Sequence, residues 1–591
     1  MNKRYTISNG ALRVQLDEHG LVRDLFVPSA RPASFTPQTK HRLGVRVDGV
    51  TSWVDDGLWS AKTRRNHNAP VNGTVLVNEA IGILLELEDV VAPHADIFMR
   101  NVHVVNLRDN QRRVSIFFHQ AYVIDSPLLP DTAQYIPKEA AILHYGSRRA
   151  FVVTGMTDIG SPPDQHSVGL FGDGLDGTWR DAEDGELSGS DVACGRVDST
   201  LRFSLTIGGL SSRRVYYWVS TSVVVREAVE LRRTITLQSV FKQTEQTVIW
   251  WRKWLTPAFR LSERLQPRYR QDFIHDVSNI RLQQDQTGAI ITDRQTAYCN
   301  PRDAAYALWP LIRLGYYDEP LRFFSFCRSI LDENGCLLSR YAADGSIGAS
   351  AHAYHHDKPP VQSDGTAIVL FVFSQFYALT KQKELLDDFY ELLIKPMAKF
   401  LTEFVDEDGL PLSSYDFADK QLGVYTYTTA VTVAALTAGA DIAEVMNDQE
   451  MAVSWRTVAE EMRTAAEDHM HSERGTIRHG KDDDHVSIAS LFGVFMFGLF
   501  DPEEDTVEQT IGEIEREFRR EDGLFACKRD KKDIDYVGSL WMAQYYIEVN
   551  RRDDAYRVVQ GIIDERTEGT SQTTWVCEEI VSTLLDTTYP T

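Results

Sequence analysis

The hydrophobic pattern of the chain changes once, near residue 222, and this change limits what the chain can fold into. Before it, short segments alternate apolar and polar residues with a period of two, as in Leu12–Leu16, Gly44–Asp48 and Leu201–Ile207. After it, apolar residues recur at helical spacing almost to the C-terminus. A period of two is typical of half-buried strands, and a spacing of three to four residues is typical of helices. We therefore expect a β part followed by an α part.

The first part, residues 1–221, is predicted to be an antiparallel β-sandwich. Turn-forming clusters such as Asp17–Gly20 and Asp109–Gln111 separate its short apolar segments. Many short strands at short intervals, with turn signals between them, are typical of two packed antiparallel sheets.

The second part begins with a predicted linker helix over residues 222–264 and continues as a helical domain over residues 265–591. Ten or more helical segments follow one another here with no strand pattern between them, which favours a repeated array of helical hairpins. In a closed ring of hairpins, the helix ends on one face surround a single concave site. The helices facing inward are then apolar nearly all round, as Ile368–Phe373 is.

The composition argues against several classes of partner. With 591 residues, two or more domains are expected, and the net charge of −23 disfavours nucleic acids and anionic membranes as partners. The six cysteines form no CxxC pair and have no zinc-ligand spacing with histidines, so free thiols in a reducing compartment are expected. No signal peptide and no apolar run of membrane-spanning length are evident. We expect a cytoplasmic protein with a neutral ligand; its oligomeric state is left open.

Polar residues gather in loops just before or at the start of predicted helices. Arg302 and Asp303 follow Pro301 and open an apolar run, so they lie at a predicted helix start. Such a pair can grip the hydroxyls of one polyol, the Arg donating and the Asp accepting. It can equally be an ion pair that caps a helix. Five such stretches in register favour a shared site, and they are residues 298–306, 341–346, 359–366, 413–428 and 575–579.

The order of these elements resembles glycoside hydrolase family 15 in its bacterial branch of glucoamylases, glucodextranases and trehalases. The family's Pro-Arg-Asp element with its leading Tyr is matched by Tyr298 and Pro301–Asp303. Its Gln-x-Asp element is matched by Gln362 and Asp364, and its Leu-Trp-x-Ala-Gln-Tyr-Tyr element by Leu540–Tyr546. The resemblance covers nearly the whole chain, from Asn9 to Glu578.

The resemblance implies an N-terminal antiparallel β-sandwich, a linker helix and a C-terminal (α/α)6 barrel. It implies exo-acting, inverting hydrolysis of terminal α-glucosidic bonds in an α-glucan or oligosaccharide, with no metal and no organic cofactor. Inverting enzymes use a general acid and a general base whose carboxyl groups lie ~6.5–9.5 Å apart. By residue the resemblance implies Asp419 as the acid, Glu578 as the base, and as sugar-binding residues Tyr298, Arg302, Asp303, Gln362 and Asp364.

The acid motif departs from the family pattern. Asp419 stands where the family has its first glutamate, Lys420 stands at the second, and Ala418 replaces a tryptophan. Asp reaches ~1.5 Å less far than Glu, and a neighbouring cation favours the ionised carboxylate. Elsewhere Asn300 replaces a tryptophan, and Glu579 stands where the family has glutamine.

Three interpretations remain open after these departures. The chain is an active hydrolase with Asp as its acid, an enzyme for another glycan, or a catalytically degraded member that acts as a carbohydrate-binding or regulatory protein. The intact Arg302, Asp303 and Glu578 favour an enzyme.

Overall fold

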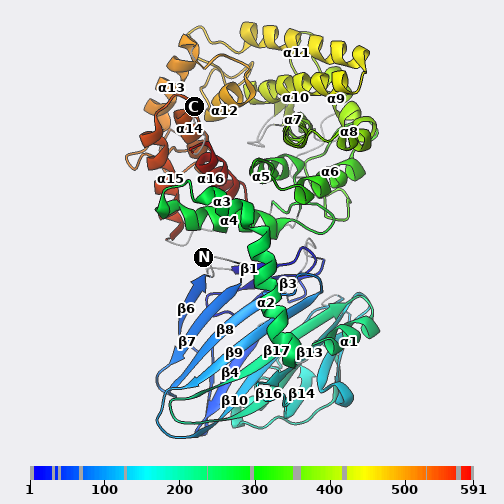
Figure 1. Cartoon of the computed structure of the whole chain (residues 1–591), viewed down its shortest axis with the longest axis vertical. Coiled ribbons are helices and arrows are strands. Elements are labelled where there is room, and N and C mark those ends of the chain that lie inside the picture. Colours follow the sequence, from blue (N-terminus) through cyan, green and yellow to red (C-terminus); the bar gives the residue numbers. More distant parts are fainter. Residues whose placement is uncertain are drawn as a thin grey trace. The chain divides into compact units, whose positions relative to one another are not determined.

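The computed structural model contains two compact units, one ending at Thr256 and the next beginning at Pro257 (Figure 1). The predicted domain boundaries, at 221/222 and 264/265, stay a prediction. The structure describes residues 5–28, 34–36, 41–65, 69, 71–125, 129–235, 237–292, 298–350, 361–415, 422–502, 504–527, 529–567 and 574–587.

The first unit consists mainly of three antiparallel sheets. One has five strands in the order β14-β16-β10-β4-β5, one has nine in the order β15-β11-β12-β13-β17-β9-β8-β7-β6, and β1-β2-β3 form a third. Their bounds are β1 Tyr5–Ser8, β2 Arg13–Leu16, β3 Val22–Phe26, β4 Arg42–Val47, β5 Val50–Trp53, β6 Ser60–Arg65, β7 Asn72–Asn78, β8 Ile83–Val91, β9 Ile97–Asn106, β10 Arg112–Ala121, β11 Asp131–Ile136, β12 Ala141–Tyr145, β13 Ala150–Thr157, β14 Gln165–Leu170, β15 Val192–Gly195, β16 Val197–Ile207 and β17 Ser212–Ser222.

The two larger sheets pack face to face, which confirms the predicted sandwich. Their inward side chains belong to one buried cluster, with Ile116 and Leu201 from the five-stranded sheet and Leu85 and Val153 from the nine-stranded sheet. Alternation along β16 places Leu201 in this cluster and Arg202 on the opposite face.

A polar network lies inside the sandwich. The Ser199 hydroxyl lies 2.7 Å from Nε2 of His144 and accepts a hydrogen bond of 2.6 Å from the Gln120 side chain. His41 Nε2 lies 3.0 Å from the carbonyl oxygen of Ala121. Burial lowers the pKa of His41 and of His144 to about 3. Both imidazoles are therefore neutral in the folded protein near neutral pH.

We expect these two histidines to make folding sensitive to acid. The unfolded chain takes up a proton on each near pH 6.5, whereas the folded chain does so only near pH 3, so stability falls as the pH falls between these values. At about pH 5 the loss is about 2 kcal/mol per histidine. Thermal melting from about pH 7 to pH 5 should show a smaller loss for His41→Gln and His144→Gln than for the wild type. An equal loss in all three proteins would refute the assignment.

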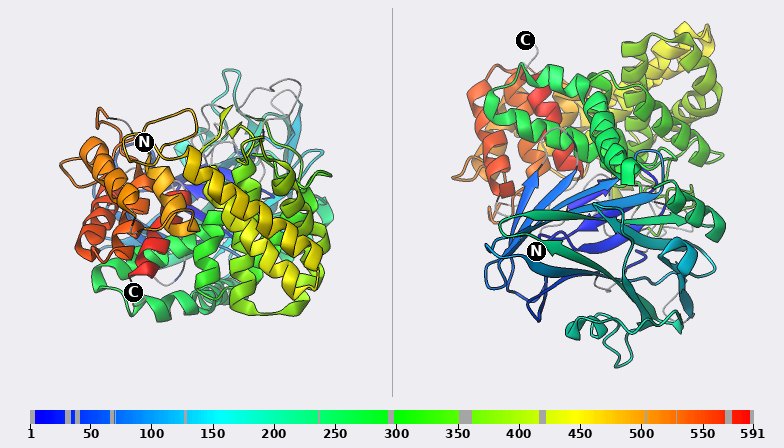
Figure 2. Two further views of the ribbon diagram at one scale, coloured as in Figure 1. Left: turned by 90° about the horizontal axis from the view of Figure 1, so that it is seen from above. Right: turned by 60° about the horizontal axis from the view of Figure 1, so that its bottom comes forward.

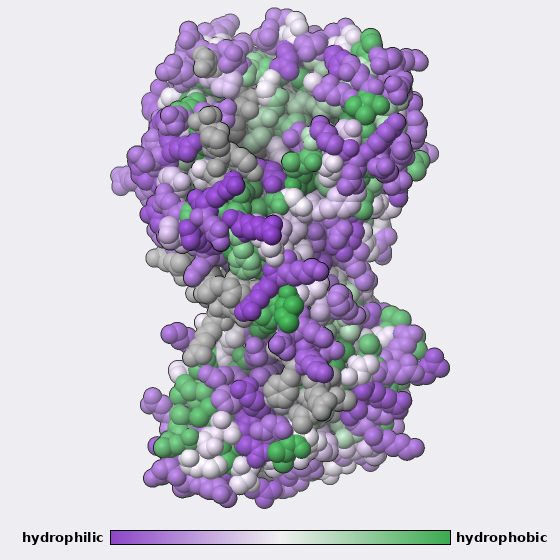
Figure 3. Space-filling model, viewed as in Figure 1, coloured by the Kyte–Doolittle hydropathy of each residue, from purple (hydrophilic) through white to green (hydrophobic). Residues whose placement is uncertain are grey.

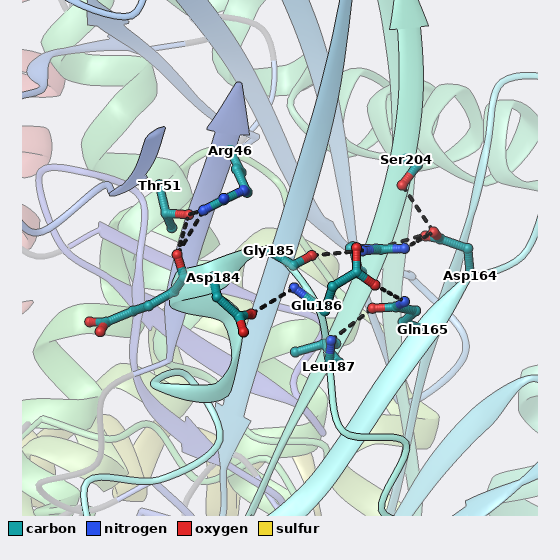
Figure 4. Close-up of polar contacts among 11 residues, drawn as sticks. Arg46, Thr51, Asp164, Gln165, Asp184, Gly185, Glu186, Leu187 and Ser204 are labelled. Carbon is teal, nitrogen blue, oxygen red and sulfur yellow. Dashed lines mark hydrogen bonds and ion pairs between the residues drawn. The ribbon is translucent and has the colours of Figure 1, made fainter. Parts of the chain in front are cut away.

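The outward face of the five-stranded sheet is covered by the segment that contains the short helix η2 (Asp181–Asp184). Arg202 donates to Asp164 at 2.7 Å and to the carbonyl of Gly185 at 2.7 Å, while Arg46 donates to the carbonyl of Glu183 at 2.7 Å (Figure 4). The covering segment buries Trp53 in a small cluster with Phe117, Ala182 and Leu187. Trp53 is thus a packing residue of the sandwich.

Three helices, α1 (Val225–Arg233), α2 (Leu237–Trp254) and α3 (Thr256–Ser262), run where the sequence predicts one linker helix. Pro257, which has no backbone N–H, lies in the first turn of α3, and such a residue is tolerated only at a helix start. The chain therefore begins a new helix here.

The second unit is a double ring of helices, as predicted. Among the described residues, six inner helices contact one another in the closed order α5, α7, α10, α12, α14, α16 and back to α5 (Figure 1). Outer helices alternate with them along the chain. The bounds are α4 Arg270–Gln283, α5 Pro301–Arg313, α6 Asp318–Ile330, α7 Ser363–Thr380, α8 Lys383–Phe389, η4 Tyr390–Ile394, α9 Lys395–Glu403, α10 Thr426–Val445, α11 Gln449–His469, α12 Ile488–Phe497, α13 Asp505–Phe518, α14 Tyr536–Glu548, α15 Arg552–Thr567 and α16 Thr574–Asp586.

Burial follows from this arrangement. The inner helix α7 is buried on nearly all sides along its first three turns, as its continuous apolar run predicts, whereas the outer helix α13 buries one stripe. Seen from above, the outer helix α11, coloured yellow, lies on the near side of this unit (Figure 2). The described helices include none long and apolar enough to cross a membrane.

A turn of one form recurs after the outer helices. After α4, the backbone N–H of Gly288 donates to the backbone carbonyl of Asp285, and the backbone N–H of Asp285 donates to the backbone carbonyl of Ala289. The same pair of hydrogen bonds recurs after α6, α9, α11 and α13. The repeat confirms the predicted array of hairpins.

The molecular face in Figure 3 is mostly hydrophilic, with hydrophobic residues among hydrophilic ones.

Candidate active site

The start of α5 positions the predicted sugar-binding pair. Asn300 is the N-cap of this helix, and its side chain accepts a hydrogen bond of 3.0 Å from the backbone N–H of Arg302. Pro301 occupies the first turn, where its missing N–H costs nothing. The asparagine that replaces the family's tryptophan therefore has a clear local role in fixing the helix start.

Arg302 lies between two carboxylates. Its Nε is 3.0 Å from Asp303 Oδ1 and its Nη1 is 3.2 Å from Asp364 Oδ2 in the first turn of α7. The Arg302 side chain is 2 % exposed and that of Asp364 is fully buried, whereas the Asp303 side chain is 21 % exposed. Asp364 thus balances the buried cation, and Asp303 is the carboxylate within reach of a ligand.

The loop predicted to carry the general acid is attached beside α7. The Ser414 hydroxyl lies 3.0 Å from that of Ser363, and the backbone N–H of Tyr415 donates to the carbonyl of Val361. Strands β18 (Ser414–Tyr415) and β19 (Leu422–Gly423) pair with each other. Asp419, the candidate acid, lies between them and outside the described residues, so its role stays a prediction.

Two adjacent glutamates on α16 have different environments. Glu579 accepts a hydrogen bond of 2.8 Å from the indole N–H of Trp541 and another of 2.7 Å from the side chain of Gln544. Glu578 is 1 % exposed, and its Oε2 has no hydrogen-bond partner within the described part of the chain. Glu579 is therefore fixed by its neighbours, and Glu578 keeps acceptor capacity for a ligand or a water molecule.

Burial and nearby charges both affect the pKa of Glu578. Burial raises the pKa of Glu578 well above its ordinary value, and the charges of Glu579 and Asp303 raise it further. Helix α5, which carries Asp303, packs on α16, which carries Glu578. The predicted base and the predicted sugar-binding pair thus lie on neighbouring helices, and a shared site stays a prediction.

Buried aromatic residues from three inner helices contact one another. The hydroxyls of Tyr306 and Tyr427 are 2.7 Å apart, and the Tyr427 ring stacks on Trp541 with centroids 6.0 Å apart. Burial raises the pKa of both tyrosines well above the ordinary value, so both are neutral. The one available signal was position: Tyr306 and Tyr427 each fall in the first turns of an inner helix.

The remaining predicted residues border the same region. Gln362 is the buried N-cap residue of α7, two positions before Asp364. Tyr298 is half-buried, and its ring packs against Gly348, where a Cβ atom would lie 2.9 Å from Cδ1 of Tyr298. Cys299 pairs with Tyr341 through two backbone hydrogen bonds of 2.8 and 2.9 Å, so two of the predicted polar stretches are joined.

The chemistry available in the described part of the site is that of carboxylates and one guanidinium. The described residues include no group of three or more His, Cys, Asp and Glu side chains that could hold a metal ion. A carboxylate pair can transfer protons to and from oxygen atoms. The paired side chains of Arg302 and Asp303 can form hydrogen bonds that orient a hydroxylated ring.

Comparisons with known proteins agree with this picture. No protein-family model matches the chain. An uncharacterized glycosyl hydrolase of Methanocaldococcus jannaschii is 20 % identical over 571 residues, covering 91 % of this chain and 87 % of the relative. A trehalase of Mycobacterium tuberculosis is 23 % identical over 288 residues, which is 44 % of this chain and 42 % of the trehalase.

The fold is shared with solved structures. A bacterial glucoamylase complexed with acarbose superposes with a TM-score of 0.72 at 12 % identity, covering 100 % of this chain and 95 % of that chain. A putative kojibiose phosphorylase from human microbiome superposes with a TM-score of 0.56 at 8 % identity, covering 96 % of this chain and 79 % of that one. The comparisons confirm the resemblance predicted from the sequence: the chain is similar to the glucoamylase and trehalase family of glycoside hydrolases.

Proposed function

We propose that the protein is an exo-acting, inverting α-glucoside hydrolase that releases glucose from the non-reducing ends of α-glucans or α-linked oligosaccharides and disaccharides. One observation carries this proposal. Glu578 is a buried carboxyl group with an unpartnered oxygen on α16, and α16 packs on α5, whose first turn carries the ion pair of Arg302 and Asp303. This placement supports one site that contains both a base and a sugar-holding pair.

The sugar-holding step uses Arg302 and Asp303. The exposed part of Asp303 accepts hydrogen bonds from hydroxyls of the terminal glucose, and Arg302 keeps this carboxylate in place through its 3.0 Å contact. Holding the terminal ring in one orientation places its anomeric carbon before Glu578, and such positioning lowers the barrier to reaction.

The chemical step uses one proton donor and one proton acceptor. Glu578, in its ionised form, removes a proton from the water that attacks the anomeric carbon. Asp419 gives a proton to the glycosidic oxygen as its bond to that carbon breaks. One C–O bond forms on the face opposite the bond that breaks, so the configuration is inverted. Glu579 is held by Trp541 and Gln544, which is why we assign the base to its neighbour.

The test is glucose release by the purified full chain from maltose, isomaltose, trehalose and soluble starch. We expect release from at least one substrate, and a loss of about 100- to 10,000-fold in Asp419→Asn and Glu578→Gln. Activity that survives Asp419→Asn would move the acid to Asp416, which also lies outside the described residues. Each reaction is run with and without inorganic phosphate, because a product that forms only with phosphate would indicate phosphorolysis in place of hydrolysis.

A second candidate function rests on the acid motif. Lys420 beside Asp419 favours an ionised carboxylate, the wrong form for a proton donor, and Ala418 removes a sugar-stacking surface. A carbohydrate-binding or regulatory protein would bind these sugars and release no glucose. Calorimetric binding measured on the samples used for the assay separates the two functions.

A further inference from the structure

Hydrogen bonds from α14 hold Glu579 of the neighbouring inner helix α16. The indole N–H of Trp541 donates to Oε1 of Glu579 at 2.8 Å, and the side-chain amide of Gln544 donates to Oε2 at 2.7 Å. The three side chains are between 1 % and 3 % exposed, so these hydrogen bonds form away from water, where they are stronger. Separate donors on the two oxygens of one carboxylate fix both its position and its plane.

A residue one turn further along α16 strengthens the same contact. The Thr583 hydroxyl donates to the backbone carbonyl of Glu579 at 2.7 Å, and it accepts from the Gln544 amide at 3.3 Å. The contact with α14 therefore involves the backbone of Glu579 as well as its side chain. It fixes this part of α16 against α14.

Trp541 is itself packed against two further inner helices. Its ring stacks on Tyr427 of α10 with centroids 6.0 Å apart, and its centroid lies 6.4 Å from that of Tyr306 of α5. The hydroxyls of these two tyrosines are 2.7 Å apart. Because the interior is close-packed, the indole that donates to Glu579 cannot turn without moving rings on α5 and α10.

Glu578 depends on the backbone of α16 for its position. Its Oε2 has no hydrogen-bond partner among the residues that the structure describes. Consecutive side chains on a helix point about 100° apart, so Glu578 does not face the donors that hold Glu579. The two residues do share one helix turn, and a contact that fixes Glu579 also fixes the backbone from which Glu578 projects.

We propose that Trp541 and Gln544 are positioning residues for the base, because they hold Glu579 and thereby set the place of Glu578. The inference rests on the proposed function, in which Glu578 removes a proton from the attacking water. A general base must lie within hydrogen-bond reach of that water, and a misplacement near 1 Å can cost about 100-fold in rate. This role needs no contact between the α14 residues and the reacting atoms.

The experiment compares kcat at the pH of maximum activity, and KM, on the substrate that the wild type cleaves best. We expect kcat to fall about 10- to 100-fold in Gln544→Leu and in Glu579→Leu, with KM nearly unchanged, because another part of the site holds the sugar. Glu579→Gln should keep kcat near the wild-type value. Its side chain can accept from the Trp541 indole, and Gln544 can turn its amide over to accept from it.

Two comparisons separate positioning from a general loss of structure. The matched control is Glu515→Leu, which removes a carboxylate of α13 that accepts from the Tyr546 hydroxyl of α14, and it should leave kcat unchanged. In a Glu578→Gln background, Glu579→Leu should lower the residual rate no further, because it acts through Glu578. A loss in Glu579→Gln as large as that in Glu579→Leu, or an undiminished loss in the Glu578→Gln background, overturns the inference while the hydrolase stands.

A crystallographic measurement needs no turnover. Structures of the wild type, Gln544→Leu, Glu579→Leu and Glu579→Gln are superposed on α5, and the carboxyl group of Glu578 is compared. It should move by about 1 Å in the two leucine variants and stay in place in Glu579→Gln. A carboxyl group that stays in place in all variants contradicts the inference. If no substrate is cleaved, the hydrolase proposal fails, and this displacement still decides whether the α14 residues position Glu578.

Discussion

Glu578→Gln should lower glucose release by about 100- to 10,000-fold and, at the same time, raise the stability of the folded chain at neutral and alkaline pH. The first effect follows from removing the group that takes the proton from water. The second follows from burial: the folded-state pKa of Glu578 lies above its unfolded value, so the folded chain binds the proton more tightly. Stability is then lost as the pH rises past the unfolded value toward the folded one, and glutamine removes this loss.

The measurement is kcat/KM together with melting temperature from about pH 5 to pH 8. Glu548→Gln is a matched control, because it neutralises an exposed carboxylate at the far end of α14. The control should leave the rate unchanged. A Glu578→Gln protein with full activity would show that another group is the base. One that is inactive and less stable at every pH would show that Glu578 has structural partners which the described residues do not reveal.

Arg302→Leu should destabilise the protein by about 3–5 kcal/mol and abolish sugar binding. The substitution leaves the fully buried carboxylate of Asp364 without its cation, and breaking one partner of a buried ion pair has costs of this size. Denaturant unfolding, followed by circular dichroism, gives the loss. The double variant Arg302→Leu/Asp364→Asn should recover part of it, because position 364 then carries no unpaired buried charge.

Arg456→Leu provides the comparison for this prediction. Its guanidinium lies 2.6 Å from Asp441, but both side chains are substantially exposed, so the expected loss is only about 0–1 kcal/mol. Similar losses in Arg302→Leu and Arg456→Leu would mean that the Arg302 cluster is not the buried centre that we describe.

The sequence predicts the architecture well because the architecture depends on local periodicity. Apolar and polar residues alternate along β16, which predicts a strand, and the continuous apolar run along α7 predicts an inner helix. The sheet order was out of reach, since β10 pairs with β4 and β16, which are far from it in sequence. The linker consists of three helices where one was expected, and Pro257 in the first turn of α3 accounts for the second of the two breaks.

The site was predicted unevenly, for similar reasons. Arg302 and Asp303 are adjacent and could be found as a pair, but the partner that buries the arginine, Asp364, is 62 residues away. The sequence Glu578–Glu579 looks like two equivalent carboxyl groups, and only the contacts from Trp541 and Gln544 distinguish them.

The configuration of the first glucose released tests the central claim most directly. Proton NMR of the reaction, recorded on soluble starch before mutarotation, should show β-glucose, because the water held by Glu578 attacks the face opposite the departing group. α-Glucose as the first product would contradict an inverting mechanism with Glu578 as the base.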